Sequence, residues 1–132
     1  MSNMEEFYKE CQEKLIKNSK LCENGECILW TGAVSRGGYG NFRYLDPGDR
    51  RYKTHSAHRV SLMLKVKNFN VSPRLHASHL CNNKLCVNAE HIRFEPSQVN
   101  CQRRTCFKMS RCNGHLDRNG NCGPDCLIHL SP

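Results

Sequence analysis

The chain has 132 residues, 38% of them hydrophobic, with ten cysteines and a formal net charge of +8. This length is typical of one domain, and the low apolar content excludes a large hydrophobic core. The sequence contains no run of about 18 apolar residues, so we expect no membrane-spanning segment.

The first ten residues, MSNMEEFYKE, are acidic and lack an apolar stretch, so we expect no secretory signal. The expected location is intracellular, in the nucleus if the protein is eukaryotic and otherwise in the cytoplasm. In a reducing compartment ten thiols are expected to bind metal rather than form disulfides. A secreted, disulfide-bonded domain that has lost its leader is the alternative. Zinc would supply the stability that a thin core cannot.

The charge is unevenly distributed along the chain. Residues 1–49 have a net charge of −2, whereas residues 50–132 have a net charge of +10. A basic region of this kind indicates a polyanionic partner, of which nucleic acid is the simplest. A soluble basic domain without such a partner is the alternative that charge alone leaves open.

Apolar residues recur at helical spacing over residues 3–19, which predicts a helix that buries Cys11 as a small hydrophobe. Strands are predicted at 28–31 and 39–45. The turn signal DPGD at 46–49 and the basic residues 50–55 then predict a hairpin with a basic return strand.

The second half of the chain contains shorter predicted elements. Residues 56–67 predict a helix, residues 75–80 a strand, and residues 97–104 a short helix. The tail that follows is rich in Cys, Asn and Gly, so we expect it to be either disordered or organised by metal.

The return strand of the hairpin carries candidate DNA contacts. Strand alternation puts Arg51, Lys53 and His55 on one face and Arg50, Tyr52 and Thr54 on the other. Because Tyr52 is the apolar member, the Arg51 face is the predicted wet face. A two-stranded basic ribbon can enter a major groove. The candidate DNA-binding residues of the hairpin are Arg43, Arg50, Arg51, Lys53 and His55.

Three metal-ligand residues fall within 11 positions: Cys81, Cys86 and His91 are spaced C-x4-C-x4-H. Thiolates and imidazole suit tetrahedral zinc, which needs a fourth ligand. Cys27 is the favoured candidate because it begins a strand that can lie beside this loop, and Cys22 is the alternative. Four protein ligands would close the site, so the predicted zinc is structural.

Two polar residues flank this loop. His79 lies two residues before Cys81, where a rigid imidazole would suit a general base. Asn100 follows 21 residues after His79, and its amide oxygen is a hard, neutral ligand suited to magnesium. A strand, a zinc loop and a helix make a ββα arrangement in which base and metal can face one phosphate.

The segment ASHLC, with Cys86, His91 and Asn100, strongly resembles the His-Cys box homing endonucleases, the zinc-bound branch of the ββα-metal (HNH-like) nucleases. The segments CILWTGAVSRGGYGNF and AHRV also resemble those of phage-type HNH endonucleases. The resemblance extends roughly over residues 27–127.

The resemblance implies an α+β fold, a small zinc-stabilised ββα-metal nuclease fold with a basic antiparallel β-ribbon and little hydrophobic core. We expect one endonuclease domain over residues 1–132. Its expected parts are an N-terminal helix (1–21), the ribbon, helix, first zinc site and active site (22–100), and a second zinc loop (101–132).

By resemblance, His79 is the general base, Asn100 the magnesium ligand, and Cys27, Cys81, Cys86 and His91 the first zinc ligands. The family also implies a second site of three cysteines and one histidine. Here Cys122 competes with Cys126 for the last position, and a set that joins Cys112, His115, Cys122 and Cys126 would resemble a zinc ribbon. Cys101 has no assigned role. The favoured ligands of the second site are Cys106, Cys112, His115 and Cys126.

The resemblance further implies an arginine on the return strand that holds the cleaved phosphate. Arg51 is favoured and Arg50 is the alternative. The family resemblance includes His58 and Arg59, which either pack the helix on the sheet or position phosphate. His76 is expected on the same strand edge without a role of its own, and a contact to phosphate is the alternative.

The implied function is a magnesium-dependent endonuclease that acts on double-stranded DNA, of the homing or HNH type, with two structural zinc ions and one catalytic magnesium ion. A homodimer is left open. The alternative is a non-catalytic, zinc-stabilised DNA-binding module on the same scaffold, and a weaker one is a zinc-organised protein-interaction domain. The presence of both His79 and Asn100 favours the enzyme.

Overall fold

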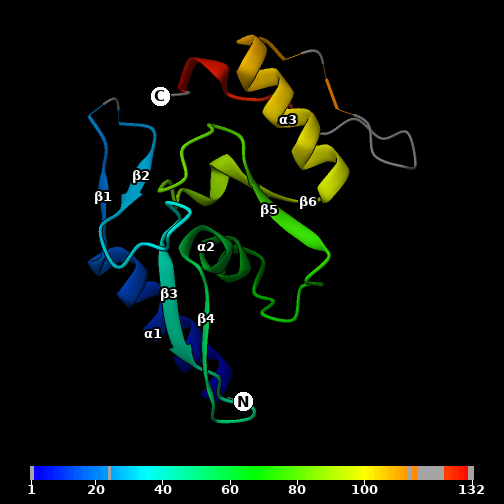
Figure 1. Ribbon diagram of the computed structural model, residues 1–132. Coiled ribbons are helices and arrows are strands. Elements are labelled where there is room, and N and C mark those ends of the chain that lie inside the picture. The colour runs from blue at the N-terminus through cyan, green and yellow to red at the C-terminus, as the bar shows by residue number, and fades with distance from the viewer. Residues whose placement is uncertain (1, 24, 113, 116–123, 131–132) are drawn as a thin grey trace.

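The computed structural model describes residues 2–23, 25–112, 114–115 and 124–130, and it shows a small α+β fold (Figure 1). Its strands pair only two by two, as antiparallel β1–β2, β3–β4 and β5–β6. In chain order the elements are α1 (Ser2–Lys17), β1 (Ser19–Leu21), β2 (Ile28–Trp30), β3 (Asn41–Leu45), β4 (Tyr52–Ser56), α2 (Ala57–Val66), β5 (Leu75–His79), η1 (Ala89–His91), β6 (Ile92–Pro96), α3 (Ser97–Met109) and η2 (Ile128–Leu130).

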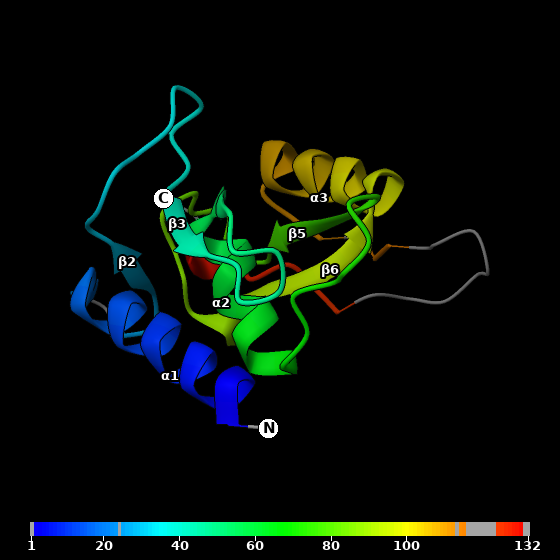
Figure 2. The ribbon, with the colours of Figure 1, turned by 90° about the horizontal axis from the view of Figure 1, so that it is seen from below.

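The helix α2 lies at the centre of the fold, with α1 on one side and α3 on the other (Figure 2). The predicted helix over residues 3–19 corresponds to α1, whose residues Phe7, Cys11 and Leu15 recur every four positions and are buried. Burial raises the pKa of Cys11 to about 11, which agrees with its predicted role as a small hydrophobe. None of the described helices is long and apolar enough to cross a membrane.

The hydrophobic core joins α1, α2 and the first strand of the ribbon. Phe42 is fully buried between the rings of Trp30 and Tyr44, and Val60 and Met63 of α2 close the same cluster. Gly40 lies so close to the Trp30 ring that an added Cβ would clash with it, so a side chain at position 40 would displace this core.

The start of α2 is bound to β5 through the side chains of His58 and Arg59. Its guanidinium donates to the carbonyl oxygens of Leu75 at 2.6 Å and Ser72 at 3.1 Å. His58 Nε2 lies 2.9 Å from the carbonyl oxygen of Ala77. Both side chains therefore pack the helix on the strand that ends at the candidate site.

The ribbon faces differ from the prediction. The register pairs Phe42 with His55 and Tyr44 with Lys53, so His55 and Lys53 share the inner face. Tyr52 is 63% exposed on the outer face, and the Arg43 guanidinium lies 4.2 Å from its ring centroid. The prediction was wrong because the apolar alternation of β3, rather than Tyr52, sets the buried face.

The return strand is also shorter than predicted. It begins at Tyr52, because Arg50 has a φ of 60° and its N–H donates to the carbonyl oxygen of Asp46 within the turn. Arg50 and Arg51 therefore precede β4. Lys53, expected to contact DNA, is bound to the carboxylates of Asp46 at 2.6 Å and Asp49 at 3.2 Å.

Two strands were not predicted. The strand β1 pairs with β2, and β6 pairs with β5 over five residues. The sequence of β6, IRFEP, has a poor apolar pattern because Glu95 is buried at 3% exposure and paired with Arg103. The helix α3 begins where predicted, at Ser97, and continues beyond residue 104 to Met109.

Replacing Phe42 with alanine should lower the free energy of unfolding by about 3–5 kcal/mol, because the side chain is fully buried among aromatic rings. Tyr52→Ala on the outer face is the matched control and should cost less than about 1 kcal/mol. Urea denaturation measures both values, and similar losses would contradict the assignment of the two ribbon faces.

Candidate active site

Four metal-ligand side chains meet beside the end of β5. The ligand atoms of Cys27, Cys81, Cys86 and His91 all lie within 4.8 Å of one another, and all four residues are buried. Cys27 directly precedes β2. Leu29 of β2 forms an antiparallel β-bridge with Cys86, so β2 lies beside the Cys81–His91 loop. The structure thus brings Cys27 to this cluster, as the sequence predicted, while Cys22 packs against its outside.

The donor geometry of this first cluster fits zinc. His91 Nδ1 lies 3.5 Å from Cys86 Sγ and 3.7 Å from Cys27 Sγ. Tetrahedral zinc, with Zn–S near 2.3 Å and Zn–N near 2.0–2.1 Å, requires S···N separations of about 3.5 Å. A hydrogen bond from Cys81 lowers the pKa of the Cys86 thiol to about 5, whereas burial raises that of Cys27 to about 12. A bound cation would displace the proton of Cys27.

The second cluster includes Cys106, which lies in the last turn of α3. Cys106, Cys112, His115 and Cys126 have ligand atoms within 4.8 Å of one another. His115 Nε2 lies 3.3 Å from the sulfurs of Cys106 and Cys126 and 3.5 Å from that of Cys112, distances that again fit a tetrahedral zinc ion. Cys122, the alternative ligand, lies outside the described residues.

The two clusters together form two zinc-type sites of three cysteines and one histidine each. Their six cysteines are thiols rather than disulfides. Four protein ligands leave no open position for substrate, which is typical of structural rather than catalytic zinc.

A pocket of about 450 Å³ opens between β5, α3 and the loop before β3, and it contains both His79 and Asn100. The two residues come from separate elements, β5 and α3, that pack on each other. The pocket is lined by Tyr39, Ser56, His58, Ala77, His79, Asn82, Lys84, Asn100, Arg103, Arg104 and Phe107.

The imidazole of His79 is held on three sides. Its Nε2 lies 2.9 Å from the carbonyl oxygen of Cys86, which can only accept, so Nε2 carries the proton. The ring of His58 packs against it at 4.0 Å between centroids, and that of Tyr39 lies nearly parallel to it at 6.2 Å. Burial lowers the pKa of His79, so the imidazole is neutral at neutral pH and Nδ1 is an acceptor.

The side chain of Asn100 is oriented by two neighbours. Its Oδ1 accepts a hydrogen bond from Ser78 Oγ at 2.9 Å, and its Nδ2 lies 3.4 Å from Nδ1 of His76. An amide oxygen has two lone pairs, so Oδ1 retains acceptor capacity for a cation in the pocket. His76, which had no assigned role, therefore helps to orient the amide.

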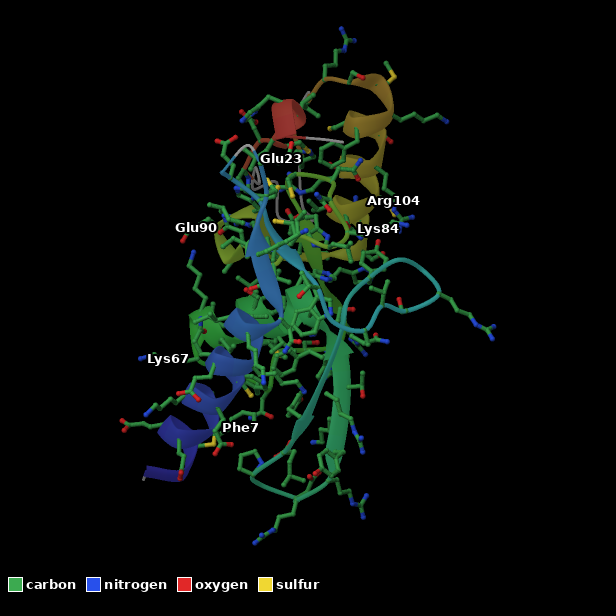
Figure 3. The ribbon with its side chains drawn as sticks, turned by 90° about the vertical axis from the view of Figure 1, so that its left-hand side faces the viewer. Phe7, Glu23, Lys67, Lys84, Glu90 and Arg104 are labelled. Atoms are coloured by element: carbon green, nitrogen blue, oxygen red, sulfur yellow. The ribbon has the colours of Figure 1, made fainter. Side chains whose placement is uncertain are left out.

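The structure does not bring Arg50 or Arg51 to this pocket. Arg50 lines a separate hollow with Phe7 at the hairpin end of the molecule. Figure 3 shows Phe7 at that end and Lys84 and Arg104 at the other. The two arginines precede β4 because of the turn at residue 50, so neither contributes a charge beside His79 and Asn100.

Three cations that the sequence reasoning did not assign line the pocket instead: Lys84, Arg103 and Arg104. Residues three and four positions after Asn100 share its face of a helix, so helical periodicity could have identified Arg103 and Arg104. Lys84 lies within the Cys81–His91 loop, where its position offered no signal.

A comparison with protein-family models matches residues 32–131 to the zinc-binding loop region of homing endonuclease. The match includes three ligands of the first cluster and all four of the second, and it begins after Cys27. Comparisons with curated proteins and with solved structures give no match.

Replacing Cys27 with serine should remove metal from one of the two clusters, because its sulfur is one of the four atoms that face a common centre. Cys22→Ser is the matched control, since the sulfur of Cys22 is outside that set. Native mass spectrometry of zinc-loaded protein after mild chelation should find one retained ion in the first variant and two in the second. Equal metal loss would contradict the assignment of Cys27.

Proposed function

The chain belongs to the family of the zinc-binding loop region of homing endonucleases, and on this premise we propose that it hydrolyses phosphodiester bonds of double-stranded DNA. One observation carries the proposal: a neutral, rigidly held imidazole and a metal-competent amide oxygen line the same pocket. A module that only binds DNA needs neither group.

His79 is the proposed general base. With Nε2 donating to the Cys86 carbonyl oxygen, Nδ1 takes a proton from the water that attacks phosphorus. The imidazolium formed keeps the Nε2 hydrogen bond, which strengthens when the ring is charged. General-base catalysis of this kind contributes about 10²–10⁴-fold to rate.

Asn100 is the proposed ligand of a magnesium ion, through Oδ1. One amide oxygen with waters and substrate phosphate oxygens is a donor set that magnesium accepts. Such an ion, when bound, stabilises charge on the leaving oxygen and orients the phosphate. Ser78 and His76 orient the amide, and the second lone pair of Oδ1 is the proposed donor to the ion.

Lys84 and Arg104 are the proposed contacts to DNA phosphates beside the reacting group. Arg103, the third cation of the pocket, is buried in an ion pair with Glu95 and is not available for substrate. Lys84 is exposed, donates to the carbonyl oxygen of Gly37 at 3.0 Å, and lies 5.2 Å from the ring centroid of Tyr39. Arg104 is exposed one helical turn after Asn100.

His79→Ala should lower the cleavage rate by about 10²–10⁴-fold while leaving DNA binding nearly unchanged, because the residue moves a proton but supplies no charge to the ground-state complex. Incubation of zinc-loaded protein with plasmid, with magnesium or with EDTA, measures cleavage, and gel shift measures binding. His129→Ala, an exposed histidine of η2, is the control and should cut normally. Binding without cleavage by the unmodified protein would favour the DNA-binding module.

Lys84→Gln and Arg104→Gln should each weaken DNA binding at all sequences and lower the slope of log K against log salt by about 1. Lys9→Gln is the control with the same charge change, because Lys9 is exposed on α1, on the other side of α2 from α3 (Figure 2). Fluorescence anisotropy over a salt series measures the slopes. Unchanged slopes in both pocket variants would contradict this phosphate assignment.

A further inference from the structure

Arg103 makes an unusually complete set of contacts at the back of the pocket. It is 1% exposed, and Nε and Nη2 donate to the two carboxylate oxygens of Glu95 at 2.5 Å and 2.7 Å. Its Nη1 donates to the carbonyl oxygen of Pro124 at 2.8 Å and to Sγ of Cys126 at 3.4 Å. Every nitrogen of the guanidinium is therefore engaged, and the group is fixed in one orientation.

These contacts join three parts of the fold. Glu95 belongs to β6, Arg103 to α3, and Cys126 to the second metal cluster. The N–H of Leu127 donates to the carbonyl oxygen of Leu80 at 2.7 Å, so the same C-terminal segment also contacts the residue after His79.

Asn100 precedes Arg103 by three residues and shares its face of α3, and both side chains line the pocket. The contacts of the Arg103 guanidinium therefore anchor the helical turn that carries Asn100 to β6 and to the C-terminal segment. The Asn100 amide in turn accepts from Ser78 of β5 at 2.9 Å and lies 3.4 Å from His76 Nδ1 of the same strand.

The charges favour an interaction of Arg103 with the second metal cluster as well as with Glu95. Three thiolates and a zinc ion carry a net charge of −1, and the carboxylate of Glu95 adds another negative charge nearby. Arg103 is the cation that contacts both groups, so the sulfur of Cys126 and the carboxylate share one guanidinium. Removal of the metal would change the charge of the cluster that contacts Arg103 but not the charge of Glu95.

We propose that Arg103 is a positioning residue that couples occupancy of the second metal cluster to the placement of Asn100 in the pocket. A metal ion in the second cluster fixes the position of Cys126. Cys126 and Glu95 then fix the guanidinium of Arg103, and Arg103 fixes the turn of α3 that carries Asn100. The part of this inference that concerns cleavage rests on the proposed function. Outer partners of metal ligands typically contribute about 10–100-fold to metal affinity.

Arg103→Lys tests the coupling, because it keeps the charge but loses the planar fork. Arg93→Lys, an exposed arginine of β6, is the matched control. Cadmium-loaded protein should give one cadmium NMR signal for each cluster, and Cys112→Ser assigns the second. Competition with a chelator should show about 10–100-fold weaker binding at the second cluster of Arg103→Lys, with the first cluster unchanged. Arg93→Lys should change neither.

A second readout follows Asn100 itself, through its side-chain amide NMR signal, assigned by its loss in Asn100→Ala. In the unmodified protein this signal should shift when metal leaves the second cluster. In Arg103→Lys it should no longer follow occupancy, and the magnesium concentration for half-maximal cleavage should rise while DNA affinity stays constant.

A structural ion pair alone would lower the melting temperature but leave metal affinity and the Asn100 signal unaffected, and that result would overturn the proposal. Equal weakening at both clusters would overturn it as well. If Arg103→Lys does not fold, Glu95→Gln keeps Arg103 and should weaken the second cluster selectively. If the unmodified protein cuts no DNA, the proposed function fails, while the cadmium and amide signals still decide the coupling.

Discussion

The hydrogen bond between Nε2 of His79 and the carbonyl oxygen of Cys86 connects the pocket to the first metal cluster. Cys86 supplies a sulfur to the first cluster through its side chain and fixes the tautomer of His79 through its backbone. The cluster therefore determines where the loop carbonyl lies, and the carbonyl determines which ring nitrogen faces the pocket. A structural metal bound by Cys86 would in this way fix the tautomer of His79, the proposed general base, through one residue.

The clusters also replace apolar packing at one end of the molecule. The aromatic core around Phe42 lies between α1, α2 and β3, whereas α3 and the C-terminal segment are held by Cys106, Cys126 and the buried pair of Arg103 and Glu95. A buried ion pair is weak evidence for stability, because desolvation offsets its attraction. The planar geometry of the Arg103–Glu95 pair instead fixes the orientation of α3 on β6. The pocket needs a fixed orientation, because its residues come from both a strand and this helix.

Residue spacing predicted the parts of the structure that depend on local chemistry. Both four-residue clusters assemble from the favoured cysteines and histidines. Spacing alone marked Cys81, Cys86 and His91, whereas the second set followed from the family resemblance. The ribbon faces were predicted wrongly, since Tyr52 was treated as the apolar member while Phe42 and Tyr44 of the partner strand set the register. The strand β6 was missed because it buries a glutamate, and nothing in the sequence indicated that Glu95 would pair with Arg103 of the predicted helix.

The distribution of charge favours the pocket as the place where the proposed DNA substrate binds. The helix α1 carries Glu5, Glu6, Glu10 and Glu13, and it lies on the opposite side of α2 from α3 (Figure 2). The exposed cations Lys84 and Arg104 lie at the rim of the pocket, so the attractive field and the proton acceptor share one face. The proposed DNA substrate would meet opposite charge at the pocket, whereas α1, which also carries Lys9, Lys14 and Lys17, offers little net charge of either sign. Arg43 of the hairpin is exposed over the Tyr52 ring and is not among the residues that line the pocket, so any contact it made to DNA would lie away from His79.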